Sequence, residues 1–60
     1  MKYVIKRNTG AYFQGITLDS RLPMFGPIIQ ASIFDTLKTA KNIIKSYNLE
    51  DCLVIEIHNS

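Results

Sequence analysis

The stretch of sequence that decides the fold is residues 35–49, DTLKTAKNIIKSYNL. Asp35 is a suitable N-cap, because its carboxylate can accept hydrogen bonds from the free amides of a first helical turn. Apolar side chains then recur at spacings of three and four, which is the period of one helix face: Leu37, Ala40, Ile44 and Tyr47, with Ile43 beside them. The sequence therefore predicts an amphipathic helix over residues 36–47.

The end of this helix is also marked. Asn48 tolerates the left-handed backbone conformation that commonly follows a last helical turn, and Leu49 can then pack back on that turn. A row of lysines lies on a second face of the expected helix, away from the apolar one: Lys38, Lys41 and Lys45. Such a row is typical of the solvent-exposed face of an amphipathic helix.

Two short strands joined by a tight turn are expected before the helix. Residues 2–7 are rich in β-branched and aromatic side chains, as strands are. Residues 8–10, Asn-Thr-Gly, tolerate positive φ and predict a reverse turn, so that residues 11–18 form the second strand of a hairpin. Gly15 marks a β-bulge within this strand. The sequence leaves open which face of the second strand is buried.

A third strand is predicted at residues 52–58, where apolar side chains alternate. We expect residues 1–60 to form a single small α+β domain, in which a three-stranded antiparallel sheet has one α-helix packed on one face, in the order β-β-α-β. The helix should cover a row of apolar residues: Leu53, Ile55 and Ile57, with Ile5 and Phe34 nearby. The opposite face, which would carry Val4 and Val54, is then left without a cover.

Residues 19–27 are predicted to form a loop, because two prolines and a glycine interrupt regular structure. Residues 28–34 fit either a short helical turn or an extended segment. The region is unusually apolar for a loop, since residues 22–29 read LPMFGPII. One interpretation is that this segment folds over the open end of the sheet and completes the core.

The other interpretation of this segment is a contact surface for a partner. The residues assigned to it are Leu22, Met24, Phe25 and Ile28. Methionine and phenylalanine adapt well to a partner surface, and prolines lower the entropic cost of ordering a segment on binding. We expect residues 22–29, together with an adjacent sheet edge, to bind another protein.

The residues that catalysis or metal binding would need are scattered. The single histidine, His58, lies six residues after the single cysteine, Cys52, on the same expected strand. Their side chains would be about 20 Å apart, which excludes a catalytic pair. The three glycines do not match a phosphate-binding motif, and the acidic residues do not cluster. We therefore expect no enzymatic activity, no metal site and no cofactor, with Cys52 as a packing residue.

The charge of the chain is only mildly positive, with seven Lys and Arg against five Asp and Glu in 60 residues. A dedicated nucleic-acid-binding domain normally carries a denser basic patch. The alternative function is weak nucleic-acid binding by the helix lysines, Lys38, Lys41 and Lys45. A homodimer joined across the uncovered sheet face or an edge strand is a third alternative.

The sequence also bears on where the protein works. A single cysteine cannot form an internal disulfide, which favours a reducing compartment for a domain of this size. The first residues do not match a signal peptide, and no run approaches the roughly 20 apolar residues that span a bilayer. We expect a cytoplasmic protein with no membrane partner; the resemblance given next implies that this cytoplasm is that of a bacterial host.

Several short motifs together resemble a loose class of small proteins from phages and mobile elements of Gram-positive bacteria. They are Tyr-Val-Ile-Lys at 3–6, Gly-Ala-Tyr-Phe-Gln-Gly at 10–15, Ala31 with Ile33-Phe34-Asp35, Ala40, and Val-Ile-Glu-Ile at 54–57. The motifs span nearly the whole chain and mostly determine the fold. The resemblance implies no catalytic residues. It implies a setting in which small proteins bind and block host proteins, among them anti-CRISPR and anti-restriction inhibitors.

The function expected from these observations is that of a non-enzymatic accessory protein. It would bind and modulate or inhibit a host protein, for example a host-defence factor. The chain lacks the acidic surface that is typical of DNA mimics, since its net charge is +2. This argues against inhibition by charge mimicry and in favour of an apolar contact.

Overall fold

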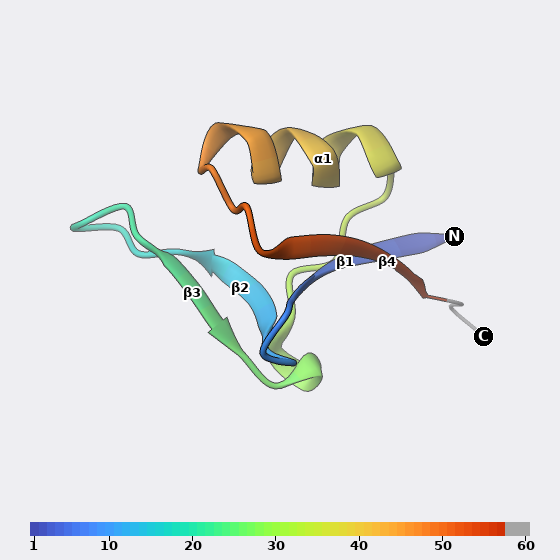
Figure 1. Cartoon of the computed structure of the whole chain (residues 1–60), viewed down its shortest axis with the longest axis horizontal. Helices are drawn as coiled ribbons and strands as arrows, with labels where there is room; N and C mark the ends of the chain where they lie inside the picture. Colours follow the sequence, from blue (N-terminus) through green and yellow to red (C-terminus); the bar gives the residue numbers. More distant parts are fainter. Residues whose placement is uncertain (58–60) are drawn as a thin grey trace.

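The computed structural model of the chain describes residues 1–57. In that range the elements follow in the order β1 (Lys2–Arg7), β2 (Tyr12–Ile16), β3 (Pro23–Gly26), the short 3-10 helix η1 (Ile28–Gln30), α1 (Leu37–Ser46) and β4 (Cys52–Ile57). The helix α1 lies above β1 and β4, and the β2–β3 hairpin extends away from them (Figure 1). The α+β class expected from the sequence is confirmed.

The sheet has four strands in the order β3-β2-β1-β4, and each neighbouring pair is antiparallel. The expectation of three strands is therefore wrong, because residues 23–26 form β3 within the segment expected to be a loop. Pro23 is compatible with this strand, since it is the first residue of an edge strand, where no ladder hydrogen bond requires its missing N–H. The fourth strand places part of the apolar segment 22–29 in the sheet itself.

The β1–β4 ladder is the most regular part of the sheet, with six consecutive residue pairs from Lys2↔Ile57 to Arg7↔Cys52. Residues directly opposite each other share a face, so Ile5 and Val54 lie on the helix side. The expectation that α1 covers the row Leu53, Ile55 and Ile57 is wrong. A shift of one residue in strand pairing moves a whole row to the other face, and Leu53 is 70% exposed.

The turn between β1 and β2 forms as predicted. Gly10 has φ of +98°, and its N–H donates to the Arg7 carbonyl at 2.9 Å. The predicted bulge at Gly15 is confirmed, since the β2–β3 register shifts between Phe13 and Gly15 and the glycine has φ of +146°. Only one pair, Lys6↔Tyr12, joins β1 to β2, so the two strands separate soon after the turn.

The gap between β1 and β2 is filled by the chain that leads into the helix. The Ser32 N–H donates to the Phe13 carbonyl at 2.9 Å, and Tyr3 and Phe34 exchange two backbone hydrogen bonds of 2.9 and 2.8 Å. Residues 28–34, for which the sequence allowed two conformations, therefore contain both. A 3-10 turn covers residues 28–30, and an extended segment follows it.

The helix boundaries agree with the sequence to within one residue, but the N-cap is Thr36 and not Asp35. The Thr36 hydroxyl accepts a hydrogen bond from the Thr39 N–H at 3.2 Å, whereas Asp35 forms an ion pair with Lys2. Asn48 adopts the predicted left-handed conformation, with φ of 56°. Leu49 then packs back as predicted: it is buried, and its N–H donates to the Ile44 carbonyl at 2.9 Å.

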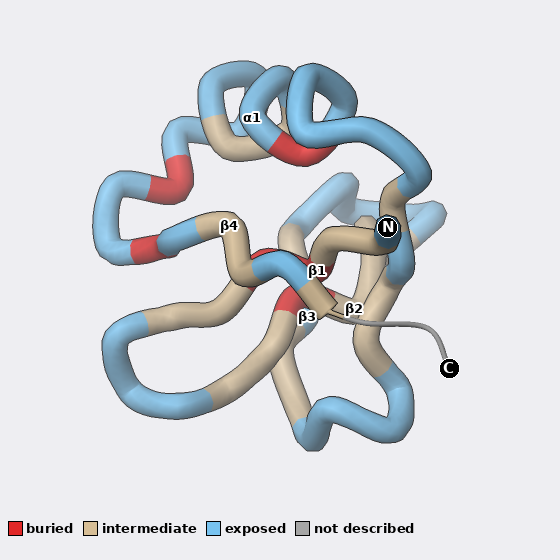
Figure 2. Tube along the Cα trace, turned by 90° about the vertical axis from the view of Figure 1, so that its right-hand side faces the viewer, coloured by how far each residue is buried: buried red, intermediate tan, exposed pale blue. Residues whose placement is uncertain are grey.

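The core lies between α1 and the sheet. Its buried cluster takes residues from strands, helix and connecting turn: Ile5, Phe13, Ala40, Leu49 and Cys52. The Phe13 ring meets Phe25 edge-on at 6.0 Å and stacks on Phe34 at 6.3 Å between centroids. Burial is confined to a few short segments of the chain (Figure 2). Phe13, and not Tyr12, thus provides the buried face of β2, and Cys52 is a packing residue as predicted.

Candidate interaction surfaces

The segment 22–29 exposes most of the apolar side chains assigned to it. Leu22 is 60% exposed, Met24 42% and Ile28 55%. Ile29, which was not assigned to the surface, is 88% exposed. Four of the ten exposed large apolar residues in the described part of the chain thus lie within these eight positions. The apolar content of residues 22–29 is visible in the sequence, and the structure adds that most of these side chains are exposed.

Phe25 differs from the other residues assigned to this surface, because it is an anchor. Its side chain packs against the core through Phe13, and the Arg7 guanidinium lies over the Phe25 ring at 4.3 Å from its centroid. Residues 22–29 therefore fit both interpretations in part, as a segment that completes the core and as a contact surface for a partner. Phe25 helps complete the core, while its neighbours Met24 and Leu22 remain exposed.

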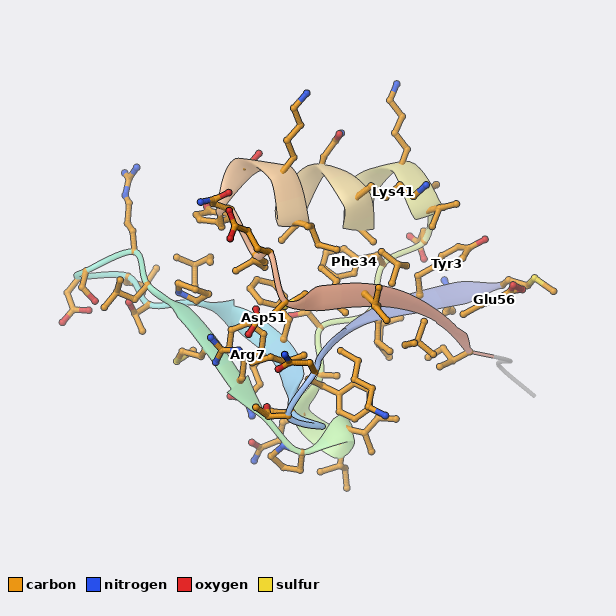
Figure 3. The ribbon with its side chains drawn as sticks, viewed as in Figure 1. Tyr3, Arg7, Phe34, Lys41, Asp51 and Glu56 are labelled. Carbon is orange, nitrogen blue, oxygen red and sulfur yellow. The ribbon has the colours of Figure 1, made fainter. Side chains whose placement is uncertain are left out.

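Arg7 connects β3 to the start of β4. Besides contacting Phe25, its Nε donates to Asp51 Oδ2 at 3.0 Å (Figure 3). The hydrogen bond from Arg7 holds the pKa of the Asp51 carboxyl below its usual range. Asp51 immediately precedes β4, so a single guanidinium links the two edge regions of the sheet.

Gln14 fixes the path of the chain from β3 into η1. Its side-chain amide passes over Gly26 and donates to Gln30 Oε1 at 2.8 Å. A Cβ at Gly26 would lie 2.1 Å from the Gln14 amide nitrogen, so only glycine leaves room for this path. The Gln14 carbonyl in turn accepts a hydrogen bond from the Ser32 hydroxyl at 2.5 Å. These contacts hold Ile28 and Ile29 in place as exposed residues.

The sheet face opposite the helix carries a second group of apolar side chains. Leu53, Ile55 and Ile57 from β4 lie on this face, with Val4 opposite Ile55 on β1. Val4 is only 1% exposed, so this face is closed at Val4 on the interior strand β1 even though α1 lies on the other face. A hollow of about 260 Å³ opens beside Leu53 and Ile55, and its remaining walls are Lys6, Arg7, Asn8 and Asp51.

The helix lysines Lys38, Lys41 and Lys45 are all exposed. Within residues 1–57 no ion pair engages any of them, since the two ion pairs there are Lys2–Asp35 and Arg7–Asp51. Two aromatic rings of β2, Phe13 and Tyr12, do not form one surface with these lysines. Phe13 is buried, and Tyr12 lies beneath Lys6 at 5.8 Å, opposite Lys6 in the register.

The chemical groups of the described chain do not converge on a reaction centre. In residues 1–57 no three His, Cys, Asp or Glu side chains are close enough to hold a metal ion. Burial raises the pKa of the Cys52 thiol, and the hydrogen bond from Lys2 lowers the pKa of the Asp35 carboxyl. His58, the other residue weighed for catalysis, lies outside the described residues. None of the helices in the described range has the length and apolar character to span a membrane.

Sequence reasoning placed the apolar row of β4 beneath the helix and so missed its exposure. Leu53, Ile55 and Ile57 alternate along β4, but the other face of the strand also carries the apolar residues Cys52 and Val54, so both faces fit a core. No protein-family model, curated protein or solved structure matches the chain, so the surfaces described above are the basis for assigning its function.

Proposed function

We propose that this chain is a non-enzymatic accessory protein of a phage or mobile element, and that it binds and modulates or inhibits a host protein. The single observation that carries the proposal is the exposure of Leu22, Met24 and Ile28 on a segment that Phe25 holds against the core. Exposed apolar side chains that are concentrated in one segment, unlike ones scattered singly over a surface, are typical of interaction sites.

The composition of the chain makes this exposure informative. A domain of 60 residues buries a smaller fraction of its surface than a larger domain does, about 60%, and its stability depends on few apolar side chains. Placing Met24, Ile28 and Ile29 in water leaves them unused for the core. Their exposure is explained if a partner covers them.

The segment is also well suited to binding because it is held in place before a partner arrives. β3 pairs with β2, and the Gln14–Gln30 hydrogen bond fixes η1 beside it. Pro23 and Pro27 restrict the backbone further. A segment ordered in advance loses little entropy on binding, so its exposed side chains contribute more fully to affinity.

The host setting comes from the resemblance to small phage and mobile-element proteins. In that setting the partner is a protein of the infected cell, such as a defence factor. The mild net charge of +2 favours an apolar contact over imitation of DNA.

A photo-cross-linking experiment tests this proposal. A photoreactive methionine analogue at Met24 should capture one host protein from a Gram-positive lysate, and excess unlabelled chain should compete for it. Met24→Asp and Ile28→Asp should each abolish the competition. Leu18→Asp is the matched control, because Leu18 is 99% exposed but lies outside the segment, and it should compete as the native chain does. Equal capture from position 24 and from Thr9 in the β1–β2 turn would contradict the assignment.

A second candidate function is weak nucleic-acid binding, favoured by the three exposed helix lysines that form no ion pair within residues 1–57. Binding of this kind depends on release of counterions and weakens steeply with salt. A titration of a DNA duplex at low salt should then show affinity that falls when Lys38, Lys41 and Lys45 are changed to Glu. Affinity that the charge reversal leaves unchanged would remove this candidate.

A further inference from the structure

Within residues 1–57 no strand pairs with the outer edge of β4, and the hydrogen bonds of β1 show which of its backbone groups point outward. Tyr3 exchanges both its backbone hydrogen bonds with Phe34, on the side away from β4. The alternate residues of β1, Val4 among them, therefore direct their N–H and C=O groups toward β4. Val4 lies opposite Ile55, so Ile55 is bonded to β1, and its neighbours Val54 and Glu56 direct their N–H and C=O groups outward.

This edge lacks the features that usually prevent strand addition. Cys52–Ile57 contains no proline and no lysine, and its six-residue register with β1 has no bulge. Figure 1 shows β4 in front of β1, and no other element of the described residues 1–57 is drawn across it. A regular, unprotected edge of this length is a template for another strand.

The helix provides a partial cover for such an added strand. Leu37, Lys41 and Ile44 follow one another at helical spacing, so they form one flank of α1 beside the sheet-facing residue Ala40. Lys41 projects from α1 toward the viewer in Figure 3, which is the side on which β4 lies. Leu37 is 41% exposed, which leaves apolar surface above the open edge.

We infer that β4 pairs antiparallel with β4 of a second copy of this chain, with Ile55 of one copy opposite Ile55 of the other. In this register, and in no other, Val54 of each copy lies opposite Glu56 of the second copy. Each such pair exchanges two backbone hydrogen bonds, so the outward N–H and C=O groups of both residues are satisfied. A register centred on Glu56 would place like charges opposite each other. A register centred on Val54 would pair Glu56 with Cys52, whose N–H already donates to Leu49.

The side chains agree with the same arrangement. On the uncovered face, Leu53 of each copy lies opposite Ile57 of the second copy, so the two apolar rows become one. On the helix face, Glu56 of the second copy lies opposite Val54, beneath the flank that carries Lys41. The opposite charges of these two residues favour the pairing. The result is a continuous sheet of two four-stranded halves related by a twofold axis.

The contact is small, because one strand of each copy and the adjoining side chains form it. Interfaces of this kind lie at the low end of the size range and are weak, so we expect a dissociation constant of about 10 to 100 µM. Sedimentation velocity from about 5 µM to about 1 mM should therefore show a 6.8 kDa monomer converting to dimer.

Charge exchange tests the geometry. Lys41→Glu and Glu56→Lys should each weaken the dimer about tenfold, and the double variant should restore native affinity to within about twofold. Lys38→Glu is the matched control, since Lys38 lies on the outer face of α1, and it should weaken the dimer by less than about twofold. Failure of the double variant to recover affinity would contradict the proposed register.

Amide hydrogen exchange provides a test that needs no substitution. The Val54 and Glu56 amides should exchange quickly in the dilute monomer and become protected as the dimer forms, whereas the Ile55 amide should be protected at every concentration. A chain that remains monomeric throughout the concentration range would overturn the inference. So would a dimer that leaves the exchange of Val54 and Glu56 unchanged, or one that Met24→Asp abolishes.

Discussion

The two edges of the sheet are built in opposite ways. β4 has six residues in unbroken register with β1, and its start belongs to the buried core through Cys52. β3 has four residues, begins with Pro23 and pairs with β2 across a bulge. The difference shows that β4 is part of the stable centre of the molecule, whereas β3 is attached to that centre mainly through Phe25.

This contrast also separates two kinds of interaction. β3 is protected against strand addition by its short length, its proline and the neighbouring bulge, so it offers side chains and not backbone groups to a partner. β4 offers the N–H and C=O groups of Val54 and Glu56 along a regular edge. A host protein at residues 22–29 and a second copy at β4 would therefore occupy different sides of the molecule, as the order β3-β2-β1-β4 requires.

The largest effect should come from the centre of the β1–β4 ladder. Ile5→Ala removes a side chain with 0% exposure and should lower the free energy of unfolding by about 3 to 4 kcal/mol. Leu53→Ala, on the neighbouring strand, should lower it by less than about 1 kcal/mol, because Leu53 is 70% exposed. Urea unfolding at micromolar concentration, where the chain is monomeric, measures both changes.

The relative size of these two effects tests which face of β4 is buried. Equal losses of stability in the two variants would show that Leu53 lies under the helix, and would contradict the register Val4↔Ile55. Ile55→Ala provides a further control, because Ile55 is half-buried on the uncovered face and should give an intermediate loss.

A smaller and local effect is expected at the other edge. Phe25→Ala removes the ring that Phe13 and Arg7 contact, and should cost about 2 to 3 kcal/mol. Because the ring is the main anchor of β3, the amides of the β2–β3 pair should lose protection from hydrogen exchange before those of the β1–β4 ladder. Simultaneous loss of protection in both parts would mean that β3 is as integral to the core as β4.

The sequence predicted best the features that depend on a few neighbouring residues. Gly10 and Gly15 were assigned to a turn and a bulge because their backbone conformations are difficult for other residues, and both have positive φ in the structure. Asn48 and Leu49 were recognised as the helix end for the same kind of local reason. The sequence also identified the lysines Lys38, Lys41 and Lys45 as an exposed row.

The features it did not predict depend on pairing between distant segments. Val4 and Ile5 are adjacent in β1 and therefore lie on opposite faces of the sheet, and both are buried. Apolar and polar residues thus do not alternate there, so the sequence of β1 does not show which face meets the helix. β3 was missed because Pro23 resembles a loop residue unless the strand is known to lie at an edge. Asp35 and Thr36 are both good caps, and the presence of Lys2 near Asp35 is set by the fold. The free edge of β4 follows only from the strand order.

The bulge beside β3 should have the next largest effect. Gly15→Ala introduces a side chain at φ of +146°, which L-residues rarely adopt, although the nearest atom, Ser32 Oγ, is 3.9 Å from the new Cβ. We expect a loss of about 1 to 2 kcal/mol that comes from backbone strain and not from a clash. Urea unfolding measures it, and Gly10→Ala, at φ of +98° with open space around it, is the matched control. A neutral result at Gly15 would mean that the β2–β3 pair rearranges around the bulge and relieves the strain.

The smallest effect concerns Arg7, which links the two edges through Phe25 and Asp51. The Arg7 hydrogen bond lowers the pKa of Asp51 from 3.8, so the folded state favours the ionised carboxyl. The stability that this pair provides is therefore present above about pH 4 and is lost as the pH falls through the lowered pKa. The contribution is small because both side chains are about 40% exposed.

The urea midpoint should stay constant from about pH 7 to about pH 5 and then decline, and Asp51→Asn should flatten the decline. Asp35, whose pKa Lys2 also lowers, accounts for the part that remains, so Asp35→Asn in addition should remove most of the acid dependence. An unchanged profile in the double variant would show that neither ion pair contributes to the stability of the fold.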